Sequence, residues 1–510
     1  MLRRLCFFLL FFLMIGCDDD GGSGSPYGEP DGGVLHNDPI DPSEFTMPML
    51  EAFRYGVNKG HRNASWGDDQ MGEIAAQTGC RSSRISLPER HLDTWGYSIE
   101  EGAIQSYIAN GLNRSLVAFL SGPAEQHSTA PASAESWERD YYMPANLYEP
   151  IWLENGDVNP DNYWAAYVHQ TVTIYHPWIR IWEVWNEPDW VSDWHHTLDW
   201  DTVPPAKEQL PRFNGSIFYY IRMLRVTYEV VKSIDPEGLV ATGGLGYASF
   251  LNAILRYTDN PADGTVTASF PKGGGDYFDV LSFHHYPLFT EGNSDAGVAS
   301  YVEHVASLKE ELIAQGYSCK YWSTTESGAP HVELDGEPSG PAYARNYLMK
   351  VMVTAQRERV SGIDWFLLTD TAAPGGSDSA FAYMGLYEDI IDVEGPSGAV
   401  KTGSGIAYTT LSTLLGEFTI DVEGTAALPL TETTSGAVFT DGTGRKCYVL
   451  WALADDGEAG AATLNLPESA ILTRYEWDYS ETGSTETLSP DAGTHTLSLT
   501  SSPSIFITNP

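Results

Sequence analysis

The chain has 510 residues, of which 42% belong to the hydrophobic set and 12% are aromatic. That is enough apolar surface to bury a large core, so the composition excludes general disorder and favours more than one domain. Lys and Arg number 28 against 69 Asp and Glu, which gives a net charge of −41. A protein that binds nucleic acid through its phosphates needs a basic surface, so this charge excludes that class.

The N-terminus has the pattern of an export signal. The Arg3-Arg4 pair precedes an apolar run, Leu5–Ile15, which is too short to span a membrane as a helix. The run ends in Met14-Ile15-Gly16-Cys17, which resembles the lipobox of bacterial lipoproteins. The resemblance implies that residues 1–16 are a signal peptide and that Cys17 carries lipid. The protein would then be an exported, membrane-anchored lipoprotein facing the periplasm or the cell surface. A plain signal peptide is the alternative, because Met14 stands where Leu is usual.

Residues 17–45 are rich in Asp, Gly, Ser and Pro, so we predict a flexible tether between the anchor and the first folded domain. Apart from Cys6 and Cys17, the chain has Cys80, Cys319 and Cys447 and no CxxC pair. These three allow at most one disulfide, and we expect buried thiols in place of a metal site.

Residues 46–408 alternate short strand patterns with longer helical ones, which is typical of βα units around a parallel sheet. The strands are predicted at Phe53–Val57, Ser83–Leu87, Ser115–Leu120, Ile179–Trp185, Leu239–Gly243, Val280–Phe283, Tyr321–Thr325 and Gly362–Leu367. Helices are predicted at Phe218–Ser233, Ala299–Gln315 and Ala342–Arg359. Eight such strands with crossovers predict a (β/α)8 TIM barrel. Long insertions at Gln126–Asn159 and Trp190–Phe213 are expected to build the ligand cleft.

Residues 409–510 differ in composition, with much Thr, Ser, Gly and Ala. Short alternating stretches separated by turn residues lie at Lys446–Leu453, Thr463–Leu466, Arg474–Trp477 and Thr494–Leu499. This pattern predicts a C-terminal all-β sandwich domain. Its aromatic residues stand mostly at strand positions, which favours a brace for the barrel over a carbohydrate-binding module.

Two of the predicted barrel strands end in a glutamate. The fourth runs into Asn186-Glu187-Pro188, and the seventh into Glu326-Ser-Gly-Ala-Pro330, so that proline ends each strand pattern. The C-terminal rim of a barrel is its active face. Two carboxylates facing each other across that rim are what glycoside hydrolysis requires, because one protonates the leaving oxygen while the other attacks or activates water.

The sequence resembles the clan A glycoside hydrolases, which are retaining (β/α)8 enzymes with an Asn-Glu-Pro motif at strand four and a nucleophilic Glu at strand seven. The resemblance is carried by Trp182-Glu-Val-Trp-Asn-Glu-Pro188, by His284-x-Tyr286 and by Glu326, and it covers roughly residues 50 to 500. Within the clan the chain is most similar to family 39, the group of β-xylosidases, α-L-iduronidases and exopolysaccharide glycosidases. In that family a β-sandwich accompanies the barrel.

The resemblance implies a retaining mechanism in which Glu187 is the acid/base and Glu326 the nucleophile. Their carboxyl groups are then expected about 5–5.5 Å apart, whereas an inverting enzyme needs roughly 6.5–9.5 Å. We expect Glu187 to lack a neighbouring cation and to lie among Trp182, Trp185 and Trp190. Burial against aromatic rings would give it the higher pKa of the two.

The resemblance also implies supporting roles. Asn186 would bind the sugar 2-hydroxyl, Tyr286 and Arg84 would hold Glu326 ionised, and His284 would lie in the same cleft. Trp365 would form a sugar platform. The alternatives are a surface ion pair for Arg84 and plain core for Trp365.

Three other residues after the first strand, His61, Asn63 and Trp66, are plausible sugar contacts. Glu183 lies on the same strand face as Glu187 and points into the barrel, so we interpret it as a buried structural acid.

Two other functions stay open on the sequence alone. His284-His285 and His195-His196 resemble metal ligands, but the first strand lacks the His-x-His of barrel metalloenzymes, so we expect no metal and no cofactor. The second alternative is a non-catalytic carbohydrate-binding surface lipoprotein on a TIM-barrel scaffold, and the presence of both glutamates disfavours it. The expected ligand is a carbohydrate, and the mouth loops suit an oligosaccharide and a polysaccharide equally.

Overall fold

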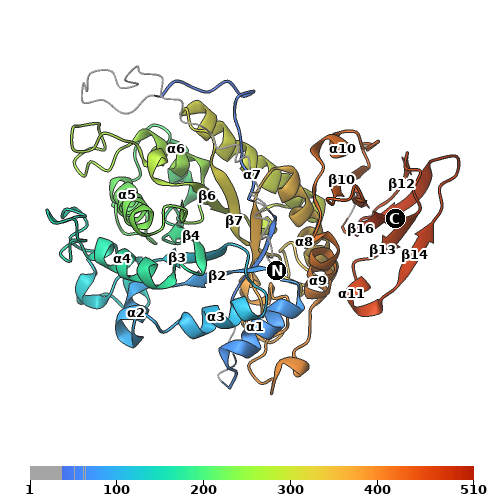
Figure 1. The fold of residues 1–510 in the computed structure, drawn as a ribbon, viewed down its shortest axis with the longest axis horizontal. Coiled ribbons are helices and arrows are strands. Elements are labelled where there is room, and N and C mark those ends of the chain that lie inside the picture. The colour runs from blue at the N-terminus through green and yellow to red at the C-terminus, as the bar shows by residue number, and fades with distance from the viewer. Residues whose placement is uncertain (1–36, 51, 61–62, 64, 456, 510) are drawn as a thin grey trace, which may run out of the picture.

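The computed structural model describes residues 37–50, 52–60, 63, 65–455 and 457–509. The predicted signal peptide, Cys17 and most of the predicted tether lie outside these residues. The described chain forms a barrel and a smaller β domain, which lies to the right in Figure 1. None of the helices in these ranges is both long and apolar enough to cross a membrane.

Eight parallel strands close into a barrel in chain order, and β1 pairs with both β2 and β8. The strands are β1 (Arg54–Asn58), β2 (Ser82–Ser86), β3 (Leu116–Leu120), β4 (Ile179–Val184), β5 (Leu239–Ala241), β6 (Val280–His284), β7 (Tyr321–Ser327) and β8 (Gly362–Trp365). Each overlaps the range predicted from its β-branched and aromatic residues. The (β/α)8 prediction is confirmed.

Helices cover the outside of the barrel (Figure 1). They are α1 (Asp68–Gln77), α2 (Glu89–Trp95), α3 (Glu101–Ala109), α4 (Tyr163–Tyr175), α5 (Ile217–Ile234), α6 (Ala248–Arg256), α7 (Ser294–Ala314) and α8 (Pro341–Arg357). Helix α7 begins at Ser294 and not at Ala299 as predicted. The reason is an N-cap, because the Asn293 side chain accepts hydrogen bonds from the backbone N–H groups of Asp295 and Ala296.

The barrel interior holds paired charges. Arg54 donates to Asp364 at 2.8 Å, and both side chains are almost fully buried. A Cβ at Gly56 would lie 1.9 Å from Asp364 Oδ1, so only glycine leaves room for this pair. A single buried charge would be costly, whereas a paired and hydrogen-bonded one is tolerated. These residues form a packed floor beneath the barrel mouth.

The C-terminal β domain follows helix α9 (Gly403–Leu415), in which Thr409, the point of the composition change, is a helical residue. A six-stranded sheet has the order β14-β13-β16-β11-β10-β9, and β12 pairs with β15. The strands are β9 (Thr419–Ile420), β10 (Thr434–Thr440), β11 (Lys446–Ala452), β12 (Ala461–Leu466), β13 (Leu472–Tyr475), β14 (Thr485–Leu488), β15 (His495–Thr500) and β16 (Ser504–Thr508); two short helices, α10 (Val422–Ala426) and α11 (Tyr479–Thr482), lie between them. The predicted all-β sandwich is confirmed.

The sandwich packs against α7 and α8 of the barrel. Trp451 Nε1 donates to Asp295 Oδ1 at 3.1 Å, and the same carboxylate pairs with the buried Lys350 at 2.8 Å. The Arg345 guanidinium lies 4.3 Å from the Trp477 ring centroid. These two tryptophans of the sandwich are therefore engaged in packing, which supports the brace interpretation.

Two of the three cysteines outside the export signal, Cys80 and Cys447, are buried free thiols. Burial raises the pKa of the Cys80 thiol to about 11, so it stays protonated and unreactive at neutral pH. Both behave as the small hydrophobic residues expected from the sequence. The expectation is wrong for Cys319, which is half-buried and disulfide-bonded.

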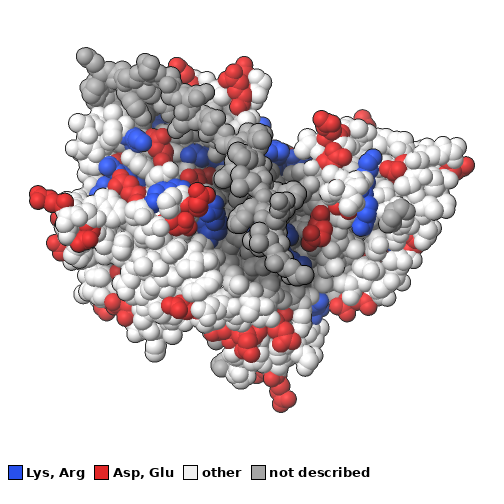
Figure 2. All heavy atoms as spheres, viewed as in Figure 1, with Lys and Arg blue, Asp and Glu red and all other residues white. Residues whose placement is uncertain are grey.

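On the face shown in Figure 2, acidic side chains are spread over both domains and Lys and Arg side chains are fewer. This distribution agrees with the net charge of −41.

Candidate active site

The ends of three barrel strands bring ionisable groups together at the mouth. Glu187 follows β4, His284 ends β6 and Glu326 lies near the end of β7. One ligand atom from each, a carboxylate oxygen or a ring nitrogen, lies within 4.8 Å of the other two. Strands β4 and β7 are not neighbours, so closure of the barrel is what places the two glutamates face to face.

Glu326 is held by the two side chains predicted for it. Arg84 Nη1 donates to Oε1 at 2.6 Å, and the Tyr286 hydroxyl donates to Oε2 at 2.7 Å. Burial, followed by the negative charge of Glu326, raises the pKa of Tyr286 well above its ordinary value, so this residue stays a phenol that can donate. Each carboxylate oxygen of Glu326 thus accepts a hydrogen bond from the protein, one from a cation and one from a phenol.

Arg84 connects four groups beneath the mouth. Besides Glu326, its Nε donates to Glu183 and its Nη2 to Asn186 Oδ1, both at 2.6 Å, and its guanidinium lies 4.3 Å from the Phe119 ring centroid. The Arg84 side chain is 2% exposed, so the alternative of a surface ion pair is wrong. Among the residues that the structure describes, no hydrogen bond occupies the Asn186 amide N–H groups, so they can donate to a ligand.

Glu183 is a buried structural acid, as predicted. It is fully buried, and Ser282 and Thr325 each donate a hydroxyl to its Oε1 at 2.7 Å while Arg84 binds its Oε2. Both carboxylate oxygens are thus occupied by protein donors. No oxygen of Glu183 remains for a substrate.

The expectation that Glu187 lacks a cation is wrong. Arg212 Nη1 forms an ion pair with Glu187 Oε2, and His284 Nδ1 lies 3.1 Å from Oε1. Burial raises the pKa of Glu187, but the hydrogen bond from His284 and the charges of His284, Arg212 and Arg84 outweigh it, so the pKa lies below its ordinary value of 4.5. Arg212 belongs to the long insertion after β4, and no strand pattern indicates where its side chain goes.

The three tryptophans expected around Glu187 have other functions. Trp182 and Trp185 are buried, and Trp185 Nε1 donates to the backbone oxygen of Arg212 at 2.8 Å. Trp190 is 37% exposed, and the Arg212 guanidinium lies 4.3 Å from its ring centroid. Trp185 and Trp190 therefore position the arginine that reaches Glu187, whereas Trp182 belongs to the core.

The backbone at the Asn-Glu-Pro motif is strained. Trp185 and Glu187 have φ values of 74° and 48°, in the left-handed region that non-glycine residues avoid. Such a residue costs about 1–3 kcal/mol and persists where its surroundings fix it. Here the Trp185 N–H donates to Leu120 O at 2.9 Å and the Glu187 N–H to Gly243 O at 2.7 Å. The strand end is thereby fixed so that Glu187 turns into the mouth.

His284 packs between the two carboxylates. Its Nε2 lies 3.1 Å from Thr325 Oγ1, and its Nδ1 lies 3.5 Å from Glu326 Oε2 as well as near Glu187. Burial lowers the pKa of His284, but the two neighbouring carboxylates outweigh that effect and raise it above its ordinary value of 6.5. Gly244 allows this packing, since it has a φ of 66° and a Cβ there would lie 2.1 Å from His284 Nε2.

The sugar platform expected at Trp365 is absent there. Trp365 is fully buried and its Nε1 donates to Met384 O at 2.9 Å, so its ring belongs to the core. Aromatic surface at this part of the rim comes from Phe366 and Phe381, whose ring centroids lie 5.9 and 4.9 Å from that of Tyr286. Phe366 lies in the predicted strand Gly362–Leu367 but follows the end of β8 in the structure, and Phe381 lies in a 3-10 helix that no strand pattern indicates.

Two of the three sugar contacts expected after β1 are structural. Asn63 Nδ2 donates to the backbone oxygens of Ile390, Ile391 and Val393, and Trp66 Nε1 also donates to Val393 O. They anchor the segment 390–393 and leave no donor for a ligand. His61 lies outside the described residues.

A cavity of about 920 Å³ opens beside Glu187. Three of its aromatic side chains reach solvent, Trp190 (37% exposed), Trp194 (57%) and Phe289 (84%). Asp189, which the sequence reasoning did not single out, lies in its wall, and burial raises its pKa to about 7. A large, partly aromatic cavity next to a carboxylate suits a sugar or a short glycan.

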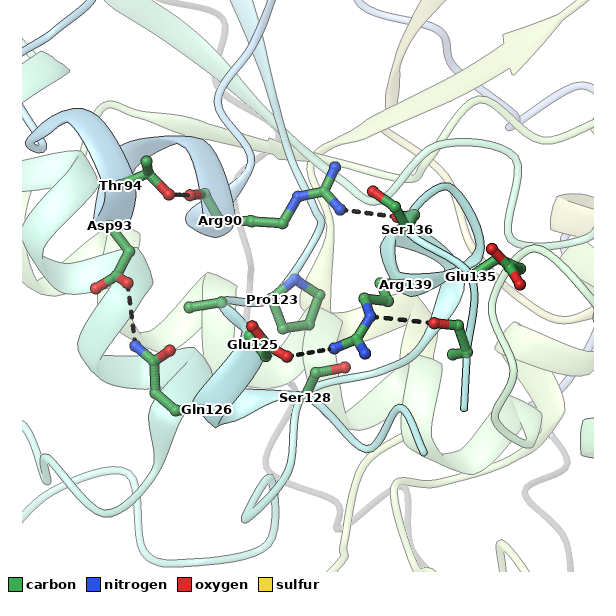
Figure 3. Close-up of a pocket in the computed structure, with 12 residues that line it drawn as sticks. Arg90, Asp93, Thr94, Pro123, Glu125, Gln126, Ser128, Glu135, Ser136 and Arg139 are labelled. Carbon is green, nitrogen blue, oxygen red and sulfur yellow. Dashed lines mark hydrogen bonds and ion pairs between the residues drawn. The ribbon is translucent and has the colours of Figure 1, made fainter. Parts of the chain in front are cut away.

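A second hollow of about 520 Å³ lies between α2 and the 126–159 insertion (Figure 3). Its two arginines already have partners, since Arg90 pairs with Asp140 at 2.7 Å and Arg139 with Glu125 at 2.8 Å. It contains none of the predicted site residues. We interpret it as a polar surface depression whose ion pairs fix the position of the insertion.

The two histidine pairs do not converge on a metal site. His284 faces the carboxylates, whereas His285 lies 3.1 Å from the Tyr347 hydroxyl, and burial lowers its pKa to about 3. His195 and His196 are exposed and lie next to Asp193. Within the described residues, the group with metal-ligand spacing is Glu187, His284 and Glu326.

We expect EDTA to leave unchanged the glycoside hydrolysis that the sequence predicts for this site. Arg84 and Arg212 donate to the same two carboxylates that a metal would need, and their charges repel a cation. The measurement is the rate on one glycoside before and after dialysis against chelator. Loss of activity that Zn²⁺, Mg²⁺ or Ca²⁺ restores would contradict this prediction.

The sequence matches no protein-family model, and no curated protein matches it. Solved structures match over nearly the whole chain. A family 39 glycoside hydrolase from the gut symbiont Bacteroides cellulosilyticus WH2 has a TM-score of 0.58 and 16% identity, over 91% of this chain and 82% of that one. The GH39 enzyme from Xanthomonas axonopodis pv. citri has a TM-score of 0.52 and 14% identity, over 93% and 98%. A monomeric β-xylosidase from Caulobacter crescentus CB15 has a TM-score of 0.51 and 15% identity, over 92% and 99%.

This chain shares the fold of those glycoside hydrolases. The likeness extends over barrel and sandwich together, because more than nine tenths of the chain is covered in each match. At such low identity the similarity concerns the fold, so the function has to be argued from the site itself.

Proposed function

We propose that the protein is a retaining glycoside hydrolase that cleaves O-glycosidic bonds of an oligosaccharide or polysaccharide by double displacement. One observation carries the proposal: a carboxylate oxygen of Glu187 and one of Glu326 lie within 4.8 Å of each other across the mouth. Retaining enzymes place their carboxyl groups about 5–5.5 Å apart, whereas inverting enzymes need roughly 6.5–9.5 Å to hold a water between them. The short separation supports direct attack by one carboxylate.

In this mechanism Glu326 is the nucleophile, because Arg84 and Tyr286 each donate to one of its oxygens and hold the carboxylate in place at the mouth. Its carboxylate attacks the anomeric carbon, the bond to the leaving oxygen breaks, and Glu187 gives that oxygen a proton. Glu187 then takes a proton from water, which displaces Glu326 from the sugar. The free amide of Asn186 is placed to donate to the sugar 2-hydroxyl.

The proposal is tested by screening the purified protein on a panel of aryl β-glycosides and polysaccharides, with Glu326→Gln as the blank. We expect the native protein, and not the variant, to release phenol or reducing sugar from at least one substrate. A native protein that hydrolyses nothing on a broad panel while binding glycans would support the non-catalytic alternative instead.

We further propose that the protein is a lipoprotein, on the basis of the Arg3-Arg4 pair, the apolar run and Cys17. Expressed in a bacterial host, Cys17→Ala should release the protein from membranes or block its processing, whereas Cys6→Ala should leave both unchanged. The measurement is the distribution between membrane and soluble fractions. Finding the unmutated protein wholly soluble would contradict the lipid anchor.

A further inference from the structure

Arg212 stands on the side of the mouth where the leaving group must lie. In the proposed function Glu187 protonates the leaving oxygen, so the departing sugar has to be next to Glu187, and Arg212 is ion-paired with that residue. The arginine is firmly placed. Its backbone oxygen accepts from Trp185 Nε1 at 2.8 Å, and the next residue, Phe213, is buried with its ring edge-on to Trp185.

The ion pair with Arg212 opposes the proposed role of Glu187 as a general acid. Arg212 holds Oε2, and His284 Nδ1 lies 3.1 Å from Oε1. A guanidinium can only donate hydrogen bonds, and its positive charge favours the ionised form of a carboxylate that it contacts. Protonation of Glu187 therefore becomes easier once Arg212 has another anion as its partner.

Released from Glu187, the arginine needs another anion. Among the described residues, Glu187 is the one carboxylate within 4.0 Å of the Arg212 guanidinium. The nearby Asp189 is buried and already accepts from the backbone N–H groups of Gly246 and Tyr247 at 2.8 and 2.9 Å. The side chain of Arg212 is 31% exposed and lies over Trp190, which lines the 920 Å³ cavity. Arg212 itself does not line the cavity, but its two contacts, Glu187 and Trp190, do, so a ligand packed against them lies next to the arginine.

We propose that Arg212 and Trp190 bind an anionic group, a uronate carboxylate or a sulfate ester, on the sugar that leaves. The inference rests on the proposed function and names its substrate class, an acidic glycan. The anion replaces Glu187 as the partner of Arg212, and Glu187 is then free to carry the proton. Binding of the correct leaving group and activation of the acid thus become one event.

The net charge of −41 does not oppose such a substrate at close range. At physiological ionic strength, charges are screened beyond a Debye length of about 8 Å. The binding of an anion in contact with a guanidinium depends mainly on that contact, because paired charge-assisted hydrogen bonds are strong. The general acidity of the surface slows the approach of the glycan but does not cancel the contact.

The test uses three glycosides of whichever sugar the screen identifies, with 4-carboxyphenyl, 4-sulfophenyl and neutral 4-carbamoylphenyl leaving groups. We expect the ratio of kcat/KM for the anionic over the neutral glycoside to fall about tenfold in Arg212→Gln, the loss of one charge-assisted hydrogen bond. Arg212→Lys should restore part of the ratio. The ratios for the 4-carboxyphenyl and 4-sulfophenyl glycosides then show which anion the site prefers.

The matched control is Arg180→Gln, which removes another partly exposed, glutamate-paired arginine at the start of β4, away from the mouth, and should keep the native ratio. A second readout is the alkaline limb of kcat/KM on the neutral glycoside, which reports the pKa of the acid in the free enzyme. Loss of the Arg212 charge should move this limb to higher pH. Equal ratios and equal limbs in native protein and Arg212→Gln would overturn the inference while the hydrolase stands. A native protein without activity on any glycoside would instead overturn the proposed function.

Discussion

Glu326→Ala should be almost inactive on natural glycans and on activated aryl glycosides alike. The nucleophile is needed whatever the leaving group, so a better leaving group cannot replace it. We expect kcat to fall on the order of 10⁴-fold or more, as for other catalytic groups that act within a unit. The measurement is the steady-state rate on a 2,4-dinitrophenyl glycoside and on one natural substrate.

The control for this variant is Glu125→Ala, which removes a glutamate that is 77% exposed and outside the mouth. It should retain the native rate, and both variants should keep the native melting temperature to within a few degrees. Equal activity of Glu326→Ala and native protein would remove Glu326 from the mechanism.

Glu187→Ala should lose far more activity on natural glycans than on activated aryl glycosides. Without the acid, a poor leaving group cannot depart, and we expect natural glycans to lose about 10²–10⁴-fold in rate, the usual contribution of a general acid. Activated aryl glycosides need no proton, so they should still form the glycosyl-enzyme. Its hydrolysis should then be slow, since Glu187 is also the base for the incoming water.

Added azide should distinguish the Glu187→Ala variant from the Glu326→Ala variant. Added azide should raise the turnover of Glu187→Ala and give a glycosyl azide of retained configuration, because it attacks the covalent intermediate. In Glu326→Ala there is no such intermediate, so any azide product should be inverted. A Glu187→Ala variant that azide does not rescue, or that yields the inverted azide, would contradict the assignment.

The sequence was sufficient to predict the barrel and the residues at the ends of its strands. The β-branched runs are short and bounded by Gly and Pro, and Pro188 and Pro330 follow the two glutamates, so the rim positions of Glu187 and Glu326 follow from strand periodicity alone. Closure of the sheet then brings them together. The contact of Arg84 with Glu326 was implied by the family resemblance and not by strand periodicity, and the contact of Arg84 with Glu183 was not predicted.

The sequence could not predict what the insertions bring to the mouth. Arg212 lies in an irregular loop without periodicity, and only the packing of its neighbours, Trp185 and Phe213, determines that it reaches Glu187. For the same reason the pKa of Glu187 was expected on the wrong side of its ordinary value. The prediction for Trp365 was wrong for another reason, because a strand-end tryptophan is equally compatible with core and rim. Its indole N–H donates to Met384, which follows a short 3-10 helix, Ala380–Tyr383, that the strand pattern does not indicate.

The most direct test of the account is the stereochemistry of the first product. The native protein is mixed with an aryl β-glycoside that it hydrolyses, and the anomeric proton of the released sugar is followed by NMR before mutarotation. Double displacement through Glu326 and Glu187 predicts that the β-anomer appears first, with the configuration of the substrate retained. Initial appearance of the α-anomer would show single displacement by water and would contradict the central claim.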